Sequence, residues 1–267
     1  MAPTPSDHTP PPPGDRTSSA PRAGTDRRFG TRLLLAVLAL AVAAVPCGVL
    51  LVLVEGHWGP LWRLDRGTAD ALHRAVRAHP ALLDVLRVCT DLLWGPWTMR
   101  LMITLLCCWL AARRAWRLAL WAALTAAASG LIGLLVKKVV ARTRPALPDP
   151  VAHAGGFSFP SGHAMTAMTC CAVALLVLLP VVPRSWRPVA WFAALVPVVG
   201  VGFTRVALGV HWVSDVLGGW LLGLALVVAT AWAFEAWRAE TGRPVPAVTE
   251  GLEPELAAPG PSEPPRV

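Results

Sequence analysis

Three short stretches of the chain combine cations, imidazoles, a hydroxyl and a carboxylate at spacings that suit phosphate chemistry. They are residues 137–145 (KKVVARTRP), 160–163 (PSGH) and 205–215 (RVALGVHWVSD). Phosphate transfer needs cations for the oxygens, a nucleophile, an acid for the leaving group and a carboxylate that holds the nucleophile. All three stretches stand at the ends of apolar segments, where ionisable groups are costly and a functional interpretation is the default.

The third stretch pairs a histidine with an aspartate. His211 and Asp215 are four residues apart, so on a helix they share a face and can touch. A carboxylate bonded to one imidazole nitrogen fixes the tautomer and leaves the other nitrogen free to attack. Arg205, six residues before His211, can clamp two phosphate oxygens. The alternative is a structural ion pair at a helix end, and this stretch alone does not decide between the two.

The second stretch predicts an anion site at the start of a helix. Pro160 and Gly162 shape a turn before a long apolar segment, and free backbone N–H groups there attract an anion. The Ser161 hydroxyl adds a donor, and His163 stands where it can protonate a leaving alkoxide or phosphate. Ordinary capping of the helix by Ser161 is expected as well, but it does not account for the histidine.

The first stretch places two cations ahead of a proline. Lys137 and Arg144 are seven residues apart, about two helical turns, so they share a face if the helix continues as far as Pro145. Two cations on one side of a pocket suit a doubly charged phosphate. For Lys138 and Arg142 the favoured interpretation is an ordinary positive flank of a membrane helix.

Apolar segments long enough to cross a bilayer position these stretches. Of the 267 residues 55% are hydrophobic and only 15% are charged, which excludes an ordinary soluble domain. We expect an all-α fold, a six-transmembrane helical bundle within residues 31–238. Five uncharged runs, and a sixth apolar run that contains Arg100, each approach the roughly 20 residues that span a hydrocarbon core. The predicted helices are residues 33–54, 92–112, 117–136, 162–182, 188–207 and 214–236.

The rest of the chain divides into two tails and one connecting segment. Residues 1–30 and 239–267 are rich in proline and in polar or charged residues, so we expect both tails to be disordered. Between the first two helices, residues 65–87 alternate apolar and charged positions at helical spacing, which predicts an interfacial amphipathic segment. The histidines of this region, including His73, lack ligand-like partners and are interpreted as solvated surface.

Loop charges predict the orientation. Arginines gather in the N-terminal tail and after the second, fourth and sixth predicted helices. With six crossings these loops and both termini are cytoplasmic, which places the active site on the extracytoplasmic side of a bacterial-type plasma membrane. The net charge of +8 does not indicate a nucleic-acid partner, because the basic residues flank membrane segments and do not gather on one soluble face.

In this order, the three stretches resemble the signature of the type 2 phosphatidic acid phosphatase (PAP2) superfamily, which vanadium-dependent haloperoxidases and bacterial acid phosphatases share. The matching pattern is Lys137-x6-Arg144-Pro145, then Pro160-Ser161-Gly162-His163, then Arg205-x5-His211-x3-Asp215. The six-helix layout extends the resemblance over residues 32–238. One position departs from the usual pattern: Thr204 stands where the family usually has serine, and a hydroxyl is retained.

The resemblance implies a role for each matched residue. His211 resembles the nucleophile that forms a phosphohistidine, Asp215 its orienting partner, and His163 the general acid. The implied phosphate-binding residues are Lys137, Arg144, Ser161, Gly162 and Arg205. No metal and no other cofactor is implied, because the cations supply the charge that a metal ion otherwise would.

We therefore expect a metal-independent, integral-membrane lipid phosphatase with a membrane lipid phosphate as substrate and the lipid bilayer as its surroundings. The resemblance points to phosphatidic acid, lysophosphatidic acid, phosphatidylglycerol phosphate or a polyprenyl (undecaprenyl) diphosphate. One alternative is a vanadate-dependent haloperoxidase, which the membrane segments count against. The other is a non-catalytic membrane scaffold or transporter, which the full set of reactive residues counts against. The patterns predict neither a monophosphate or diphosphate preference nor an oligomeric state.

Overall fold

The described part of the chain is helical. The computed structural model describes residues 41, 45–240 and 251–252, and no strand occurs among them, which confirms the all-α prediction for these residues. The predicted tails, apart from residues 239–240 and 251–252, and most of the predicted helix 33–54 lie outside the described residues. In chain order the elements are Val45–Glu55, α2 (Gly59–Arg77), α3 (Pro80–Val88), the π-helical turn η1 (Cys89–Leu93), α4 (Pro96–Ala112), α5 (Trp116–Val140), α6 (Gly162–Leu178), the 3-10 turn η2 (Arg184–Trp186), α7 (Arg187–Ala207) and α8 (Val213–Glu240).

Several of these helices are long and apolar enough to cross a membrane. They are Pro80–Ala112, which joins α3 to α4, then α5, Arg184–Ala207 and Val213–Arg238. The bent pair of Val45–Glu55 and α2 adds a fifth if it counts as one span. α6 is apolar but has only 17 residues. The described residues thus contain four or five candidate spans, and the count of six stays a prediction.

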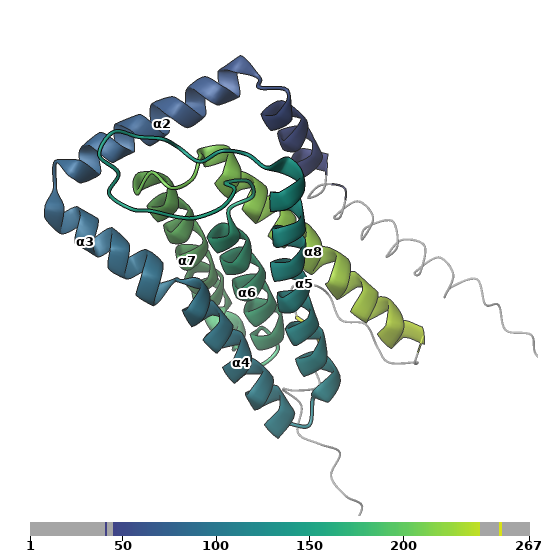
Figure 1. The fold of residues 1–267 in the computed structure, drawn as a ribbon. Coiled ribbons are helices and arrows are strands. Elements are labelled where there is room, and N and C mark those ends of the chain that lie inside the picture. The colour runs from purple at the N-terminus through teal and green to yellow at the C-terminus, as the bar shows by residue number, and fades with distance from the viewer. Residues whose placement is uncertain (1–40, 42–44, 241–250, 253–267) are drawn as a thin grey trace, which may run out of the picture. The chain divides into compact units, whose positions relative to one another are not determined.

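α2 lies across one end of the bundle. An angle of 88° separates it from the helix Val45–Glu55, and it runs along the top in Figure 1. Its buried residues Asp65, Ala69, His73 and Val76 recur at three- and four-residue intervals, so one face of this amphipathic helix is covered. That face packs against the segments that follow α5 and α7.

His73 belongs to this covered face, which corrects its interpretation as solvated surface. The residue is only 3% exposed, and its Nε2 donates a hydrogen bond to the carbonyl of Pro148 at 2.8 Å. The segment between α5 and α6 folds back over α2 and encloses the ring. A sequence pattern shows which side of a helix is polar, but it does not show that a distant loop covers this side.

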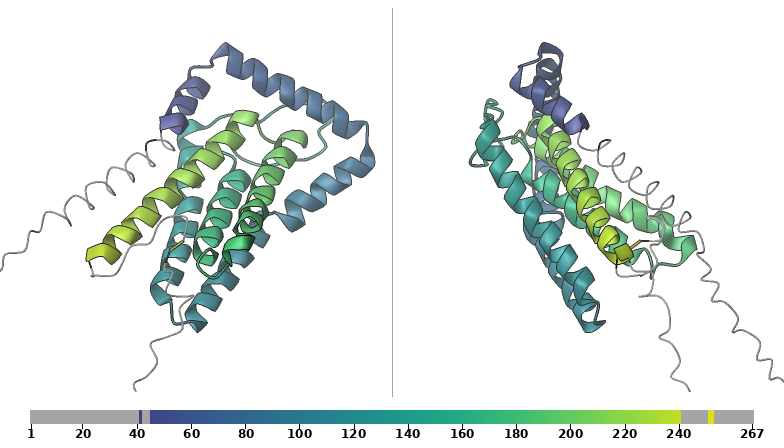
Figure 2. Two further views of the ribbon diagram at one scale, coloured as in Figure 1. Left: turned by 180° about the vertical axis from the view of Figure 1, so that it is seen from behind. Right: turned by 90° about the vertical axis from the view of Figure 1, so that its right-hand side faces the viewer.

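α6 occupies the middle of the bundle, where it packs against α4, α5, α7 and α8 (Figures 1 and 2). Glycines make its contact with α8 close. A Cβ at Gly219 would lie 2.7 Å from the carbonyl oxygen of Ser161, and one at Gly223 would lie 2.9 Å from that of Met165. Small residues let membrane helices approach each other closely, and here they bring together the N-terminal ends of α6 and α8.

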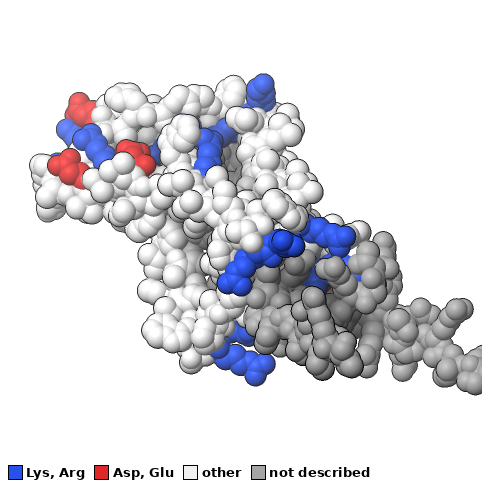
Figure 3. Space-filling model, turned by 90° about the horizontal axis from the view of Figure 1, so that it is seen from below, with Lys and Arg blue, Asp and Glu red and all other residues white. Residues whose placement is uncertain are grey.

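The three sequence stretches meet at the end of the bundle that α2 crosses. α5 and α7 finish there, and α6 and α8 begin there. The α4–α5 and α6–α7 connections lie at the opposite end. Figure 3 views the molecule from that opposite end and shows several blue Lys and Arg side chains, whereas the red acidic side chains form one group at an edge.

Candidate active site

The third stretch forms a tight connection between α7 and α8. α7 ends at Ala207, Gly209 turns the chain with a φ of +69°, and α8 begins at Val213. His211 therefore lies in the connection and not on the helix. It still touches Asp215, with 3.3 Å between Nδ1 and Oδ2. The two residues meet across a helix N-terminus, and not along one helix face as the spacing predicts.

The start of α8 holds Asp215 in place. Asp215 is the third residue of that helix, and its Oδ2 also accepts the backbone N–H of Trp212 at 2.9 Å. This is half of a capping box, in which a side chain in the first turn satisfies a backbone donor just before the helix. Asp215 and His211 are both buried, with 0% and 2% of their surface exposed. The carboxylate is thus a fixed acceptor for the imidazole.

The neighbours of His211 determine its tautomer. Nη1 of Arg144 lies 3.1 Å from Nε2, and because a guanidinium only donates, Nε2 is the acceptor and carries a lone pair. The proton of the neutral ring is then on Nδ1, which donates it to Asp215. Burial lowers the pKa of His211 from 6.5 to about 4, against the opposing effect of Asp215. At neutral pH the ring is therefore uncharged, which is the form that a nucleophile requires.

The second stretch forms the turn before α6 and the first turn of that helix. Ser161 caps α6, because its Oγ accepts the N–H of Ala164 at 3.5 Å. Its own backbone N–H donates to the carbonyl of Asp215 at 2.9 Å, which ties this turn to the third stretch. Gly162 begins the helix, and a Cβ at this position would lie 3.8 Å from Cε of Lys137. The backbone of the turn is therefore accessible beside a lysine.

The cations of the first stretch do not share a helix face. α5 ends before Pro145, and Ala141 turns the chain in the left-handed conformation, with a φ of 49°. The continuous helix on which the predicted alignment depended is absent here. Both side chains nevertheless reach the same carbonyl oxygen, that of Phe157: Lys137 Nζ donates to it at 2.8 Å and Arg144 Nη2 at 3.2 Å. They converge because the chain folds back, and not because of helical periodicity.

Arg205 lies in the last turn of α7 and is the most deeply buried cation of the predicted set. It is 7% exposed, and its Nε has no hydrogen-bond partner among the residues that the structure describes. Burying a charged donor without an acceptor costs free energy. An anion beside this guanidinium would remove that cost.

His163 is the second residue of α6 and belongs to the same cluster. The cations whose charges act on it are Arg205, Arg144 and Lys137, which come from the other two stretches. All eight site residues predicted from the sequence therefore gather at one end of the bundle. The arrangement provides two imidazoles, three cations and a helix N-terminus around one small region, which is a suitable environment for a phosphate group.

Two further charged residues, Arg142 and Asp65, lie behind Asp215, and the sequence motifs do not predict them. Arg142, which its position indicates to be a positive flank, donates through Nη1 to Oδ1 of Asp215 at 2.6 Å. Its Nη2 donates to Oδ2 of Asp65 at 2.8 Å. Asp65 belongs to α2 and is 1% exposed. The only sequence signal for Arg142 is its position two residues before Arg144, and no sequence signal connects Asp65 with the site.

A cavity of about 620 Å³ opens beside the cluster. Arg144 and Val210 line it on the side of the site, and His73 and the segment 145–154 contribute much of the remaining wall. Within the described chain, no group of three or more His, Cys, Asp or Glu side chains is arranged to hold a metal ion.

Residues 118–239 match the family model described as the PAP2 superfamily. Phosphatidylglycerophosphatase B of Bacillus subtilis (strain 168) is 41% identical over 99 residues, which make up 36% of this chain and 48% of that protein. Undecaprenyl-diphosphatase of Sulfolobus acidocaldarius is 36% identical over 102 residues, 35% of this chain and 44% of that protein. The chain thus spans about half the length of these curated relatives.

A solved structure shares the fold. It is the crystal structure of a transmembrane PAP2 type phosphatidylglycerolphosphate phosphatase from Bacillus subtilis, with a TM-score of 0.65 and 27% sequence identity. The similarity covers 76% of this chain and 96% of that chain. Together with the candidate spans, this similarity makes the protein a multi-pass integral membrane protein.

Proposed function

The chain belongs to the PAP2 superfamily, and from that premise we propose that it hydrolyses a phosphate monoester or diphosphate on a membrane lipid through a phosphohistidine. The observation that carries the proposal is the surroundings of Arg205. The Nε of this buried guanidinium lacks an acceptor among the described residues, and the charge of Arg205 acts on His163 together with those of Arg144 and Lys137. Two imidazoles beside unsatisfied positive charge favour an anionic substrate that reacts with a nitrogen nucleophile.

In the proposal the three cations and the first turn of α6 form the phosphate cradle. Lys137 and Arg144 now donate to the carbonyl oxygens of residues 155–157. A phosphate dianion is a stronger acceptor than a carbonyl, and an arginine can bind two of its oxygens in parallel. Arg205, the Ser161 hydroxyl and the backbone N–H of Gly162 supply the remaining donors. The cradle stabilises the charge on the equatorial oxygens, so the mechanism requires no metal ion.

The first chemical step transfers the phosphoryl group to the protein. Nε2 of His211 attacks phosphorus, the N–P bond forms, and the P–O bond to the leaving group breaks. His163 gives its proton to the leaving oxygen, which belongs to a lipid alcohol or, for a diphosphate, to a lipid monophosphate. The phosphorylated imidazole is positively charged because its Nδ1 keeps a proton, and Asp215 at 3.3 Å stabilises that charge.

The second step restores the protein. A water molecule attacks phosphorus from the side of the departed lipid, and His163, now neutral, takes up its proton as general base. The N–P bond breaks, inorganic phosphate leaves, and the electron pair returns to Nε2 of His211. Both histidines are then in their starting protonation states, so the cycle balances.

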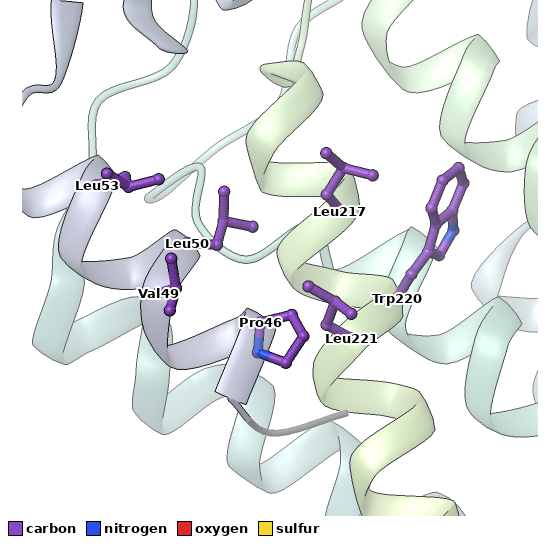
Figure 4. A pocket seen from close by; sticks show the side chains of 7 residues that line it. All are labelled: Pro46, Val49, Leu50, Leu53, Leu217, Trp220 and Leu221. Atoms are coloured by element: carbon purple, nitrogen blue, oxygen red, sulfur yellow. The ribbon is translucent and has the colours of Figure 1, made fainter. Parts of the chain in front are cut away.

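An apolar groove favours a lipid over a small soluble phosphate ester. The groove lies between the helix Val45–Glu55 and α8 and has a volume of about 320 Å³ (Figure 4). Its lining residues are Pro46, Val49, Leu50, Leu53, Leu217, Trp220 and Leu221. Leu50 and Leu221 also pack with Phe159, just before the turn that carries Ser161. We assign the groove to a lipid tail, because a tail there lies against apolar surface while its phosphate reaches the cradle.

The names of the relatives make phosphatidylglycerol phosphate and undecaprenyl diphosphate the first substrates to test. Phosphatidic acid and lysophosphatidic acid complete the panel. We further propose that the site faces the extracytoplasmic side. The opposite end of the bundle carries arginines in its short connections, among them Arg113, Arg114 and Arg184, and such loops are retained in the cytoplasm.

The deciding experiment measures phosphate release from this panel by purified protein in detergent micelles, with EDTA present and vanadate as an inhibitor. His211→Ala should abolish release, because no other group takes over the attack. His79→Ala, which removes an exposed imidazole from the connection between α2 and α3, is the matched control and should leave release unchanged. Release by His211→Ala at the parental rate would refute the mechanism. Oxidation of bromide by vanadate-loaded protein would instead favour a haloperoxidase.

A further inference from the structure

A line of buried charges connects the site with α2. Asp65 of α2 accepts from Nη2 of Arg142 at 2.8 Å, and Nη1 of the same guanidinium donates to Asp215 at 2.6 Å. The side chains of the two carboxylates are 1% and 0% exposed, and that of the arginine is 14% exposed. One arginine therefore bridges two buried acids, and the second acid holds His211.

Asp65 also caps the helix that carries Asp215. Its Oδ1 accepts the backbone N–H of Ser214 at 2.9 Å, and its Oδ2 accepts the Ser214 hydroxyl at 2.5 Å. Ser214 is the second residue of α8, so its N–H is one of the donors that the helix itself leaves unsatisfied. The cap comes from a residue 149 positions earlier in the chain. α2 thereby determines the position of the first turn of α8, and with it that of the catalytic pair.

Asp65, Arg142 and Asp215 together carry one net negative charge. Without Asp65, the charge of Arg142 would cancel that of Asp215, and no net negative charge would remain to stabilise positive charge on His211. Asp65 and Asp215 without Arg142 would leave two buried carboxylates close together, and like charges at short range repel each other. Removing either partner of a buried pair is costly for the same reason.

We propose that Asp65, acting through Arg142, is a positioning residue for the His211–Asp215 pair. It offsets the charge of Arg142 and holds the start of α8, so that Asp215 remains a correctly placed acceptor for Nδ1 of His211. This role rests on the proposed function, because it concerns the step in which the imidazole becomes positively charged. Asp65 touches neither the phosphate cradle nor the nucleophile, so it should affect the rate of the chemical step and not the binding of phosphate.

The test compares Asp65→Asn with Asp70→Asn. Both substitutions remove one negative charge from α2, but Asp70 forms no side-chain hydrogen bond or ion pair among the described residues, whereas Asp65 forms both. Asp65→Asn should lower kcat about 10- to 100-fold, the usual effect of losing a group that orients a catalytic ligand. The KM of Asp65→Asn should stay within about twofold of the parental value, since the cradle is intact. The dissociation constant and the stoichiometry of inorganic phosphate binding should stay within the same limit. Asp70→Asn should match the parent in every measurement.

A merely structural role predicts a different pattern. A partly unfolded Asp65→Asn protein would lose phosphate-binding sites and thermal stability together with kcat, and that result would overturn the proposal. Arg142→Lys supplies a second variant, because a lysine keeps the charge but cannot bridge two carboxylates with a planar fork. It should lower kcat in the same way with phosphate binding retained. If Asp65→Asn does not fold, parental kcat in Arg142→Lys overturns the proposal.

The double variant Asp65→Asn with Arg142→Gln tests the coupling. Because it removes the compensated pair together, its loss of kcat should be smaller than the product of the two single losses. Independent, multiplying losses would contradict the proposed coupling. His211→Ala is assayed in the same series: activity in that variant refutes the proposed function, whereas an inactive His211→Ala beside a fully active Asp65→Asn refutes the positioning role alone.

Discussion

Gly219→Ala adds one methyl group at the closest contact between α6 and α8. The new Cβ would lie 2.7 Å from the carbonyl oxygen of Ser161 and 3.0 Å from the backbone nitrogen of Met165. Both atoms belong to the backbone, so no side chain can rotate away. The methyl group therefore pushes the first turn of α6, which carries Gly162 and His163, away from α8, which carries Asp215.

The distances set the size of the effect. Ordinary contact begins at 3.4 Å, so the helices must separate locally by about 0.7 Å. Overpacking of this kind costs about 1–3 kcal/mol of stability, and the gain in helix propensity from glycine to alanine offsets about 1 kcal/mol of it. A misplacement approaching 1 Å lowers catalytic rates by about 100-fold. We therefore expect kcat/KM for a lipid phosphate to fall about 10- to 100-fold, with a modest decrease in the thermal midpoint.

Gly130→Ala is the matched control. Gly130 lies within α5, and a Cβ there meets nothing within 4 Å. Phosphate release and thermal unfolding are measured for both variants in the same detergent. Gly130→Ala should retain parental activity and stability. If Gly219→Ala behaves like Gly130→Ala in both measurements, the close packing of α6 on α8 does not position the site, and the reasoning is refuted.

Three further predictions concern the nucleophile, the groove and the cradle. Burial lowers the pKa of His211 from 6.5 to about 4. Between pH 6.5 and pH 4 the unfolded chain therefore binds a proton at this residue that the native protein does not bind. The native protein loses stability as the pH falls through this range. The thermal midpoint should fall between pH 6.5 and 4, and less in His211→Asn; an equal fall in both would contradict this assignment. Leu217→Trp fills the apolar groove, so it should raise the KM for a dioleoyl lipid phosphate but not the KM for its dihexanoyl analogue. Leu224 is an exposed residue of α8 outside the groove, and Leu224→Trp should change neither KM. Arg205→Lys should weaken the binding of inorganic phosphate about 10-fold, because an ammonium group cannot bind two phosphate oxygens in parallel. Loss of phosphate release in the presence of EDTA would contradict a cradle that works without a metal ion.

The apolar pattern of the sequence predicts where the helices lie, but it does not predict where each helix ends. The uncharged run that predicts a helix at 117–136 corresponds to α5, but α5 continues to Val140 and thereby includes Lys137. The helix predicted at 162–182 begins at Gly162 but ends at Leu178. Apolar runs locate helices because the bilayer requires apolar length. Caps and packing determine where helices end, and these depend on neighbours that a local pattern does not contain.

The residues at the site divide in the same way. Their types and short spacings single out His163, His211 and Asp215 as candidate site residues, and the resemblance to the family implies their roles. The sequence by itself also determined that these groups stand at helix ends. Only the tertiary structure decided that Asp65 caps α8, that Arg142 bridges two acids, and that His73 is enclosed. These contacts join residues 73 to 149 positions apart. The packing of one helix face against a distant loop selects such partners, and no periodicity along the chain records that choice.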